Sequence, residues 1–175
     1  MLVVGLKKMP QIGVIGMGDM GRLYVRIFVT NGYKCNVCDL PDKYPYLYEE
    51  FKNEPNVMVF KDGFGVSRIS DFIIYSVEAA SIRKAVANFG PATKIGAIVG
   101  GQTSVKEPEI LAFEEYLPSD VHIVSFHSLH GPNVNPKGQP LVVIRHRADD
   151  SAYSLALSIL QTLESDIVSL SYTEQ

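Results

Sequence analysis

The sequence has few cysteines, no long apolar run and no large excess of charge of either sign. Its two cysteines cannot supply the four ligands that a structural zinc ion usually takes, so the sequence predicts no metal site. The longest apolar runs, such as DFIIYSV, are far too short for a membrane-spanning helix. A net charge of −3 favours neither nucleic acid nor an anionic membrane as a partner. These absences indicate a cytoplasmic protein that binds neither nucleic acid nor a membrane.

The two cysteines, Cys35 and Cys38, lie in the segment YKCNVCD. The Cys-x-x-Cys spacing occurs in redox motifs and in halves of zinc sites. Here it falls in a strand-like segment, whose alternation would direct the two thiols to opposite faces of a sheet. We therefore predict two buried strand cysteines with a packing role.

The chain of 175 residues, of which 46% are hydrophobic and 20% charged, is long enough for one domain with a full-sized core. Its first residues, MLVVGLKK, place the basic side chains after the apolar run, the reverse of the order in a secretory signal. We expect residues 1–10 to form a leader before the first strand and residues 11–175 to form a single domain.

Strand-like and helix-like segments alternate along the chain. The predicted strands are Gln11–Ile15, Lys34–Cys38, Val57–Phe60, Phe72–Val77, Ile95–Val99, Val121–Ser125, Leu141–Ile144 and Ile167–Leu170. The predicted helices are Asp19–Asn31, Tyr46–Lys52, Ala80–Asn88, Val105–Tyr116 and a last one that Asp149 and Asp150 cap and that extends through Leu163. This alternation predicts an α/β fold of the Rossmann type, a doubly wound and mostly parallel sheet with helices on both faces. Phe126–Gln139 is predicted as a long loop, and loops of that length usually carry function or are disordered.

A glycine-rich segment, IGVIGMGDMG, follows the first predicted strand and opens an amphipathic helix. Gly16 would permit a tight turn, Gly18 the approach of a pyrophosphate to the backbone, and Gly21 close packing of helix and strand. The helix N-terminus would offer N–H groups and a partial positive charge to the phosphates. Asp39, which lies 18 residues after Gly21 at the end of the next strand, completes the pattern of a dinucleotide-binding fold. The candidate cofactor-binding residues are Gly16, Met17, Gly18, Asp19, Met20, Gly21, Arg22, Asp39, Ser76 and Val77.

The residues leave the choice between NAD and NADP open. The carboxylate of Asp39 would hydrogen-bond the ribose hydroxyls of NAD and repel the additional phosphate of NADP. Arg22 and Lys43 lie close by in the sequence, and either cation could pair with that phosphate. Residue chemistry alone slightly favours NAD.

Two further segments are predicted at the same edge of the sheet. GGQTSVKEPE follows one strand and FHSLHGP follows another, and doubly wound sheets bind ligands at the carboxyl ends of their strands. Gly100 and Gly101 would allow an unusual backbone conformation there. Ser104 could cap the following helix or direct its hydroxyl into the site, and the stretch itself favours neither. His127 or His130 could act as an acid–base group, or both could be ordinary polar residues of a loop.

Four segments resemble the nucleotide-binding domain of prephenate dehydrogenases, in particular the fungal NADP-dependent type. They are GVIGMGDMG, SDFIIYSVEAASI, IVGGQTSVKEPEI and HSLHGPNVNPKGQPLVVI, and the resemblance extends from about Gln11 to the end of the chain. It implies NADP as the cofactor and the oxidative decarboxylation of prephenate to 4-hydroxyphenylpyruvate, in tyrosine biosynthesis. In this family a histidine in the position of His127 receives the proton of the substrate's ring hydroxyl, and a serine in the position of Ser104 hydrogen-bonds beside it. Family members also have a helical domain that forms a homodimer and binds the substrate carboxylates; we expect it to be absent from these 175 residues and the chain to be poorly active by itself.

Some residues depart from the family pattern. Ser128 stands where bacterial relatives have proline, and Gln102 stands where they often have aspartate. Lys106 and Lys137 are the candidate partners for a substrate carboxylate within the chain. Two other functions stay open: another NAD(P)-dependent dehydrogenase, of the β-hydroxyacid type, and a non-catalytic module that senses nucleotides.

Overall fold

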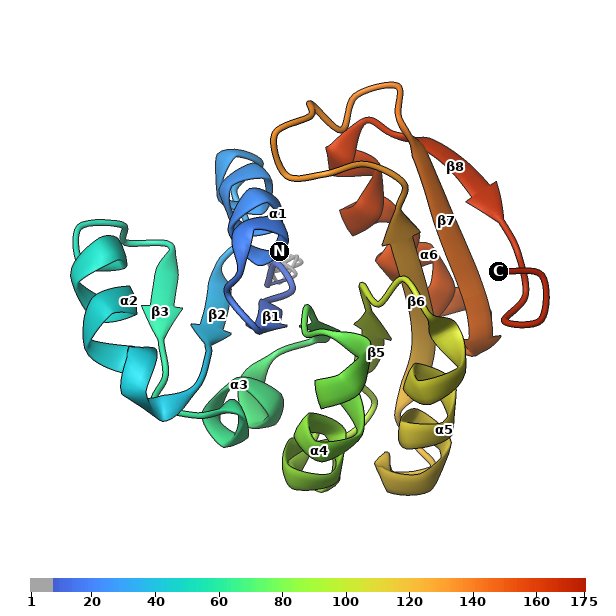
Figure 1. The fold of residues 1–175 in the computed structure, drawn as a ribbon, viewed down its shortest axis with the longest axis horizontal. Helices are drawn as coiled ribbons and strands as arrows, with labels where there is room; N and C mark the ends of the chain where they lie inside the picture. Colours follow the sequence, from blue (N-terminus) through green and yellow to red (C-terminus); the bar gives the residue numbers. More distant parts are fainter. Residues whose placement is uncertain (1–7) are drawn as a thin grey trace, which may run out of the picture.

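The computed structural model describes residues 8–175, which form one sheet with helices on both of its faces (Figure 1). The strands are β1 (Ile12–Ile15), β2 (Cys35–Cys38), β3 (Val57–Val59), β4 (Phe72–Tyr75), β5 (Ile98–Gly101), β6 (His122–Ser128), β7 (Pro140–Arg147) and β8 (Asp166–Ser169). The α-helices are α1 (Asp19–Thr30), α2 (Tyr44–Phe51), α3 (Gly63–Ile69), α4 (Ala79–Phe89), α5 (Lys106–Tyr116) and α6 (Asp150–Leu160). Most of the predicted leader, residues 1–7, lies outside the described part of the chain.

The strand order, β3-β2-β1-β4-β5-β6-β7-β8, is that of a doubly wound sheet. The first six strands run parallel, β7 is antiparallel to β6, and β8 is parallel to β7. The chain winds outward from β1 to β3 and then returns to place β4 on the other side of β1. Ligands of doubly wound sheets bind at such a reversal, outside the carboxyl ends of the strands. The predicted fold class is confirmed.

Side chains alternate between two apolar cores, one on each face of the sheet. In β4, Phe72 and Ile74 face the core under α1, α2 and α6, whereas Ile73 and Tyr75 face the core under α3, α4 and α5. A strand covered on both faces has no polar side, which explains why β4 is a continuous apolar run in the sequence. Among residues 8–175, no helix has both the length and the apolar character needed to cross a membrane.

The prediction for the cysteines is confirmed. Cys35 and Cys38 are free and buried, and they belong to the cores on opposite faces of the sheet. Burial raises the pKa of each thiol to about 12, so both remain protonated at neutral pH.

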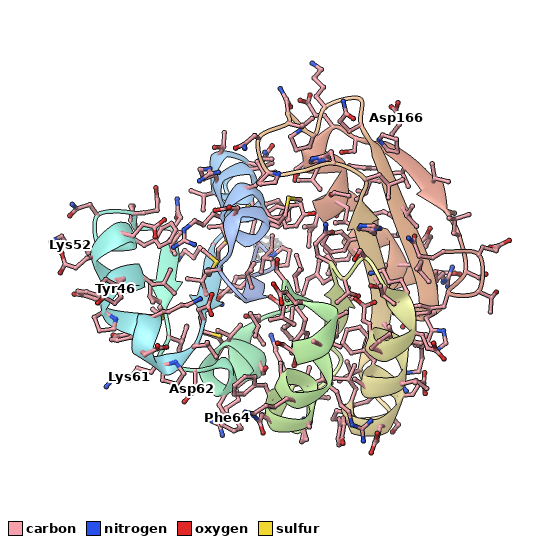
Figure 2. All side chains as sticks on the ribbon, viewed as in Figure 1. Tyr46, Lys52, Lys61, Asp62, Phe64 and Asp166 are labelled. Carbon is pink, nitrogen blue, oxygen red and sulfur yellow. The ribbon has the colours of Figure 1, made fainter. Side chains whose placement is uncertain are left out.

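Helix α3 was not predicted from the sequence. Its seven residues include Gly63 and Gly65, which disfavour an isolated helix. Both glycines are used for close packing, because a Cβ on Gly63 would lie 2.4 Å from the ring of Phe89 and one on Gly65 2.2 Å from Phe60. Asp62 caps the helix by accepting a hydrogen bond of 2.9 Å from the N–H of Phe64, and both residues lie at its beginning (Figure 2).

The bounds of most strands differ from the prediction by a few residues, and the differences in β5 and β6 affect the candidate site. β5 begins at Ile98, because Ile95 is exposed and Gly96 has a φ of 73°, and it extends through Gly101. β6 continues through Ser128, so His127 lies in a strand and the loop begins only after it. The antiparallel pairing with β7, in which His127 opposes Val142, extends the strand by hydrogen bonds that the sequence of β6 does not reveal.

Substituting a buried ring should test how strongly the core depends on β6. Phe126 is fully buried, and its ring centroid lies 5.6 Å from that of Tyr24 and 6.4 Å from that of Phe72. We expect Phe126→Ala to lower the free energy of unfolding by about 3–5 kcal/mol through lost contacts and a cavity, measured by urea denaturation.

Tyr46→Ala is the matched control, because Tyr46 is 77% exposed at the outer surface of α2 (Figure 2). Its loss should change stability by less than about 0.5 kcal/mol. Equal effects of the two substitutions would contradict the assignment of Phe126 to the core.

Candidate functional site

The turn between β1 and α1 is built from backbone packed against backbone. Gly16 has a φ of 101°, and its N–H donates to the carbonyl of Cys38 at 2.9 Å. A Cβ on Gly16 would lie 2.3 Å from the carbonyl oxygen of Ser76, and one on Gly21 would lie 2.3 Å from that of Gly16. Only glycine fits at these two positions, as the sequence pattern predicts.

Gly18 differs from its two partners, because a Cβ there would meet no atom within 4 Å. Gly18 is the N-cap residue of α1, and no side chain caps the helix. The N–H groups of the first helical turn, which include those of Asp19 and Met20, have no partner within the helix. The space over Gly18 therefore combines backbone donors with room for a ligand, and this is the arrangement that binds phosphates.

A cleft of about 480 Å³ opens at this point. Its wall is formed by the turn after β1, the ends of β4 and β5, and the loop after β6. The lining residues include Gly18, Asp19, Met20, Ser76, Val77, Gln102, Ser104 and Pro132. The structure thus brings six of the candidate residues into one cleft at the reversal of the strand order.

Asp39, the acidic residue at the end of β2, holds the glycine turn. One carboxylate oxygen accepts the N–H of Met17 at 2.7 Å, and the other accepts that of Leu40 at 2.7 Å. The ammonium group of Lys43 lies 3.7 Å from the second oxygen. These bonds leave lone pairs on both oxygens for a ribose hydroxyl, but they fix the orientation of the carboxylate.

Arg22 is held by an acidic partner on α2. Its Nε and Nη2 donate to the carboxylate of Glu50, both at 2.8 Å, and its Nη1 donates to the carbonyl of Met17. The hydrogen bond to Glu50 raises the pKa of Arg22, so the guanidinium is charged at any pH of interest. The two cofactor-selecting candidates, Asp39 and Arg22, therefore bind the same residue of the turn, Met17.

Ser104 is exposed and lines the cleft. The N-cap of α5 is Val105, which has no side-chain cap, so the capping role that the sequence left open for Ser104 is not formed. Two residues before Ser104, the side chain of Gln102 accepts the N–H of Ser128 at 3.2 Å. This bond joins the two segments that the sequence predicted to form one wall.

His127 is half-buried at the carboxyl end of β6, on the sheet face that α5 covers. Ser125, which points to the same side two residues earlier, hydrogen-bonds residues of α5. The Nδ1 of His127 lies 3.1 Å from the side-chain amide nitrogen, Nε2, of Gln175. Burial lowers the pKa of His127, the Lys106 ammonium lowers it further, and Glu109 opposes this, so the imidazole is neutral at pH 7.

His130 is the second histidine of the segment. Its Nδ1 lies 2.8 Å from the carbonyl oxygen of Gly131.

The two lysines named as carboxylate partners are placed differently by the structure. Lys106 is only 4% exposed and directs its ammonium group into the protein, so it is not available to a substrate carboxylate. Lys137 is exposed, 4.0 Å from Glu164. The polar residues around Lys106 were missed by sequence reasoning, although Lys106 and Glu109 are spaced i, i+3 on one helix face.

Two curated relatives share most of the chain. No protein-family model matches it. A protein of Schizosaccharomyces pombe, named as a probable NADP(+) prephenate dehydrogenase, is 55% identical over 97% of this chain and 39% of its own length. The NADP(+) prephenate dehydrogenase of Saccharomyces cerevisiae is 50% identical over 93% of this chain and 36% of its own length. The chain is a homologue of these fungal enzymes. It spans less than two-fifths of their length.

The prephenate dehydrogenase of Aquifex aeolicus has the same fold. Its complex with hydroxyphenyl propionate and NAD+ superposes with a TM-score of 0.76 at 16% identity, over 96% of this chain and 62% of that one. At this identity the likeness concerns the fold, whereas the fungal relatives connect the chain to NADP-dependent enzymes by sequence.

Alanine at two glycines of the turn should separate folding from ligand binding. Gly18→Ala adds a methyl group that meets no protein atom within 4 Å, so its cost in stability should be about 1 kcal/mol or less. The same methyl group would occupy the space over the turn, and we expect the affinity for NADP, measured by calorimetry, to fall at least about tenfold.

Gly16→Ala is the comparison, because its methyl group would meet the Ser76 carbonyl and its φ is positive. It should lower the midpoint of thermal unfolding strongly. If Gly18→Ala binds NADP as the parent does, the space over Gly18 is not the phosphate site.

Proposed function

We propose that the chain is the nucleotide-binding domain of an NADP-dependent prephenate dehydrogenase. The observation that carries the proposal is the 55% identity to a fungal relative over 97% of the chain, which contains the whole cleft at the strand reversal. The predicted reaction is the oxidative decarboxylation of prephenate to 4-hydroxyphenylpyruvate, a step of tyrosine biosynthesis.

The glycine turn fits the diphosphate of a dinucleotide. Gly18 leaves space over the backbone, and the N-terminus of α1 directs uncapped N–H groups and a partial positive charge toward it. Ser76 and Val77, which directly follow β4, also line the cleft. A bound nicotinamide would supply the redox chemistry by accepting a hydride, while the residues of the chain position the reacting groups.

His127 is proposed as the base that receives the proton of the substrate's ring hydroxyl. The hydroxyl oxygen becomes a carbonyl when its carbon loses a hydride, so its proton needs an acceptor. The depressed pKa of His127 keeps the imidazole neutral and able to accept that proton at pH 7. Ser104, which lines the cleft and has no capping role, is proposed to hydrogen-bond the same hydroxyl. Loss of carbon dioxide then leaves an aromatic ring, which favours the reaction.

NADP is favoured over NAD by the names of the two fungal relatives. The carboxylate of Asp39 is held by the N–H groups of Met17 and Leu40, and its charge opposes an additional phosphate. To bind the additional phosphate of NADP, Arg22 would have to share or exchange its contact with Glu50. The side chain of Arg22 is 29% exposed, so it can be reached from the solvent.

Replacement of His127 tests the catalytic proposal. In a protein that carries this chain at the full length of its relatives, His127→Asn should lower turnover of prephenate by about 10²- to 10⁴-fold, because the general base is lost. The affinity for NADP should be unchanged. In the parent, kcat/KM should fall as the pH drops below the ordinary histidine pKa of 6.5, since the base must be neutral and its pKa is depressed.

His122→Asn is the control, since His122 lies at the beginning of β6, away from the cleft. Near-normal turnover in His127→Asn would remove His127 from the role. Oxidation of a β-hydroxyacid in place of prephenate, or tight NADP binding without any oxidation, would instead support one of the two other functions.

Replacement of Arg22 tests the cofactor preference. We expect the chain to bind NADP more tightly than NAD in side-by-side calorimetry. Arg22→Gln should weaken NADP binding by about tenfold or more, the value of a charge-assisted contact to phosphate, and leave NAD binding within about twofold. Arg26→Gln, an exposed arginine one turn further along α1, controls for the loss of charge. Equal losses for NAD and NADP in Arg22→Gln would contradict this role.

A further inference from the structure

Regular pairing between β5 and β6 ends early. The two strands pair through Ile98 with His122 and Val99 with Ile123, although β5 continues through Gly101 and β6 through Ser128. Beyond these pairs the two backbones stay close, since a Cβ on Gly100 would lie 2.3 Å from the carbonyl oxygen of Val124. Regular strand pairing therefore does not set the placement of the segments that carry Ser104 and His127.

Two buried side chains connect the ends of β5 and β6. The ammonium group of Lys106 donates to the carbonyl of Gly101, at the end of β5, at 3.1 Å and to the carbonyl of Phe126, in β6, at 2.8 Å. The hydroxyl of Ser125 accepts the N–H of Gly101 at 3.1 Å and lies 3.1 Å from the ammonium group. The carbonyl of Phe126 belongs to the peptide bond that joins it to His127, so the contact acts directly on the backbone that presents the imidazole.

Glu109 supplies the opposite charge and has no exposed surface. Its carboxylate lies 3.1 Å from the Lys106 ammonium and accepts hydrogen bonds from Ser125 at 2.5 Å, Thr103 at 2.8 Å and Tyr172 at 3.0 Å. A buried ion pair of this kind is often no more stabilising than well-packed apolar residues. Stabilisation of the core therefore does not by itself explain why these polar residues are buried here. Their hydrogen bonds to the ends of both strands do explain it.

The two glycines at the end of β5 accommodate the cluster. A Cβ on Gly101 would lie 2.0 Å from a carboxylate oxygen of Glu109, and one on Gly100 would lie 2.3 Å from the carbonyl oxygen of Val124. Neither glycine has a positive φ. They are required for close approach of the cluster and of β6, and not for the unusual backbone conformation that the sequence predicted.

We propose that Lys106 is a positioning residue, which ties the ends of β5 and β6 together from beneath the cleft and so sets the placement of His127 relative to Ser104. This inference rests on the proposed function. Lys106 contacts neither the cleft nor a ligand site; it acts through the carbonyls of Gly101 and Phe126 and through the charge that it places under the imidazole.

The charges that face His127 within residues 8–175 come from α5. The pKa of His127 is lowered by burial and then by the Lys106 ammonium, and it is raised by Glu109. On β7 the residue opposite His127 is the apolar Val142, and the C-terminal segment contributes the neutral amide of Gln175. Tyr172, from the same segment, is bound to Glu109, and its pKa is raised by burial, so it adds no charge at neutral pH.

An NMR titration of the histidine side chains in the 175-residue chain tests the arrangement independently of activity. The signal of His127 is assigned by its loss in His127→Asn. Lys106→Met should raise the pKa of His127, because a nearby cation is removed, and Glu109→Gln should lower it, because an anion is removed. Lys94→Met, which removes an exposed lysine bound to Asp71, should leave it unchanged.

Turnover in the protein at the full length of its relatives tests the positioning itself. Lys106→Met should lower kcat for prephenate oxidation by about 10²-fold, as expected for a displaced catalytic group, with KM for NADP within about twofold of the parent. A folded Lys106→Met variant with parental turnover and an unchanged His127 titration would overturn the inference. If the parent itself does not oxidise prephenate, the proposed function fails, while the titration still decides whether Lys106 and Glu109 act on His127.

If Lys106→Met does not fold, Ser125→Ala and Glu109→Gln can test the inference in its place, because both variants retain the buried ammonium group of Lys106. Ser125→Ala removes the hydroxyl bridge without changing any charge, and we expect about a tenfold loss in kcat with little change in KM for NADP. Parental turnover in Ser125→Ala, together with an unchanged His127 titration in Glu109→Gln, would overturn the inference in the same way.

Discussion

The candidate site depends on a contact between backbone groups at the centre of the sheet, where side chains have no room. Gly16 lies between the carbonyl of Cys38, at the end of β2, and that of Ser76, which directly follows β4. The N–H of Ser76 in turn donates to the carbonyl of Ile15 at 2.8 Å. This interlocking places the beginning of α1 over the point where the strand order reverses. A ligand at the cleft therefore meets fixed backbone donors whose positions do not depend on flexible side chains.

The side chains that approach the turn are already bound to the protein. Asp39 accepts the N–H of Met17, and Arg22 donates to the carbonyl of the same residue while it pairs with Glu50. A carboxylate and a guanidinium thus both hold Met17, one through its N–H and the other through its carbonyl. Selection between two dinucleotides at such a turn is a competition between the ligand and these internal partners, and the mere presence of an acidic or basic residue in the motif does not decide it.

Polar groups beneath the cleft have a different role from those that line it. Residues such as Met20, Gln102 and Ser104 line the cleft, whereas Lys106 and Glu109 are buried and bond to β5, to β6 and to the segment that carries Ser104. A buried ammonium in contact with several acceptors resists displacement, because any movement leaves a charge without partners in a medium of low dielectric constant. Such a cluster can hold a site rigid where the regular pairing of the strands has ended.

Local signals in the sequence accounted for much of this architecture. The apolar runs of the central strands, the glycine spacing of the first turn and the N-cap at Asp149, which accepts the N–H of Ala152 at 2.7 Å, were all predicted. Helix α3 was missed because its glycines are explained only by Phe60 and Phe89, which lie elsewhere in the chain. His127 was assigned to a loop because the pairing of β6 with β7 depends on residues that follow it by more than ten positions.

The sequence by itself determined the order of the strands, the fold class and the place of the glycine turn, because these depend on periodicity and on residues close together in the chain. Only the tertiary structure decided that Asp39 and Arg22 bind one turn residue, that Ser104 is not a cap, and that Lys106 is buried beneath the site. These properties arise from contacts between segments that are distant in the sequence. The sequence around a charged residue does not show whether that residue will bind water, a ligand or a buried carboxylate.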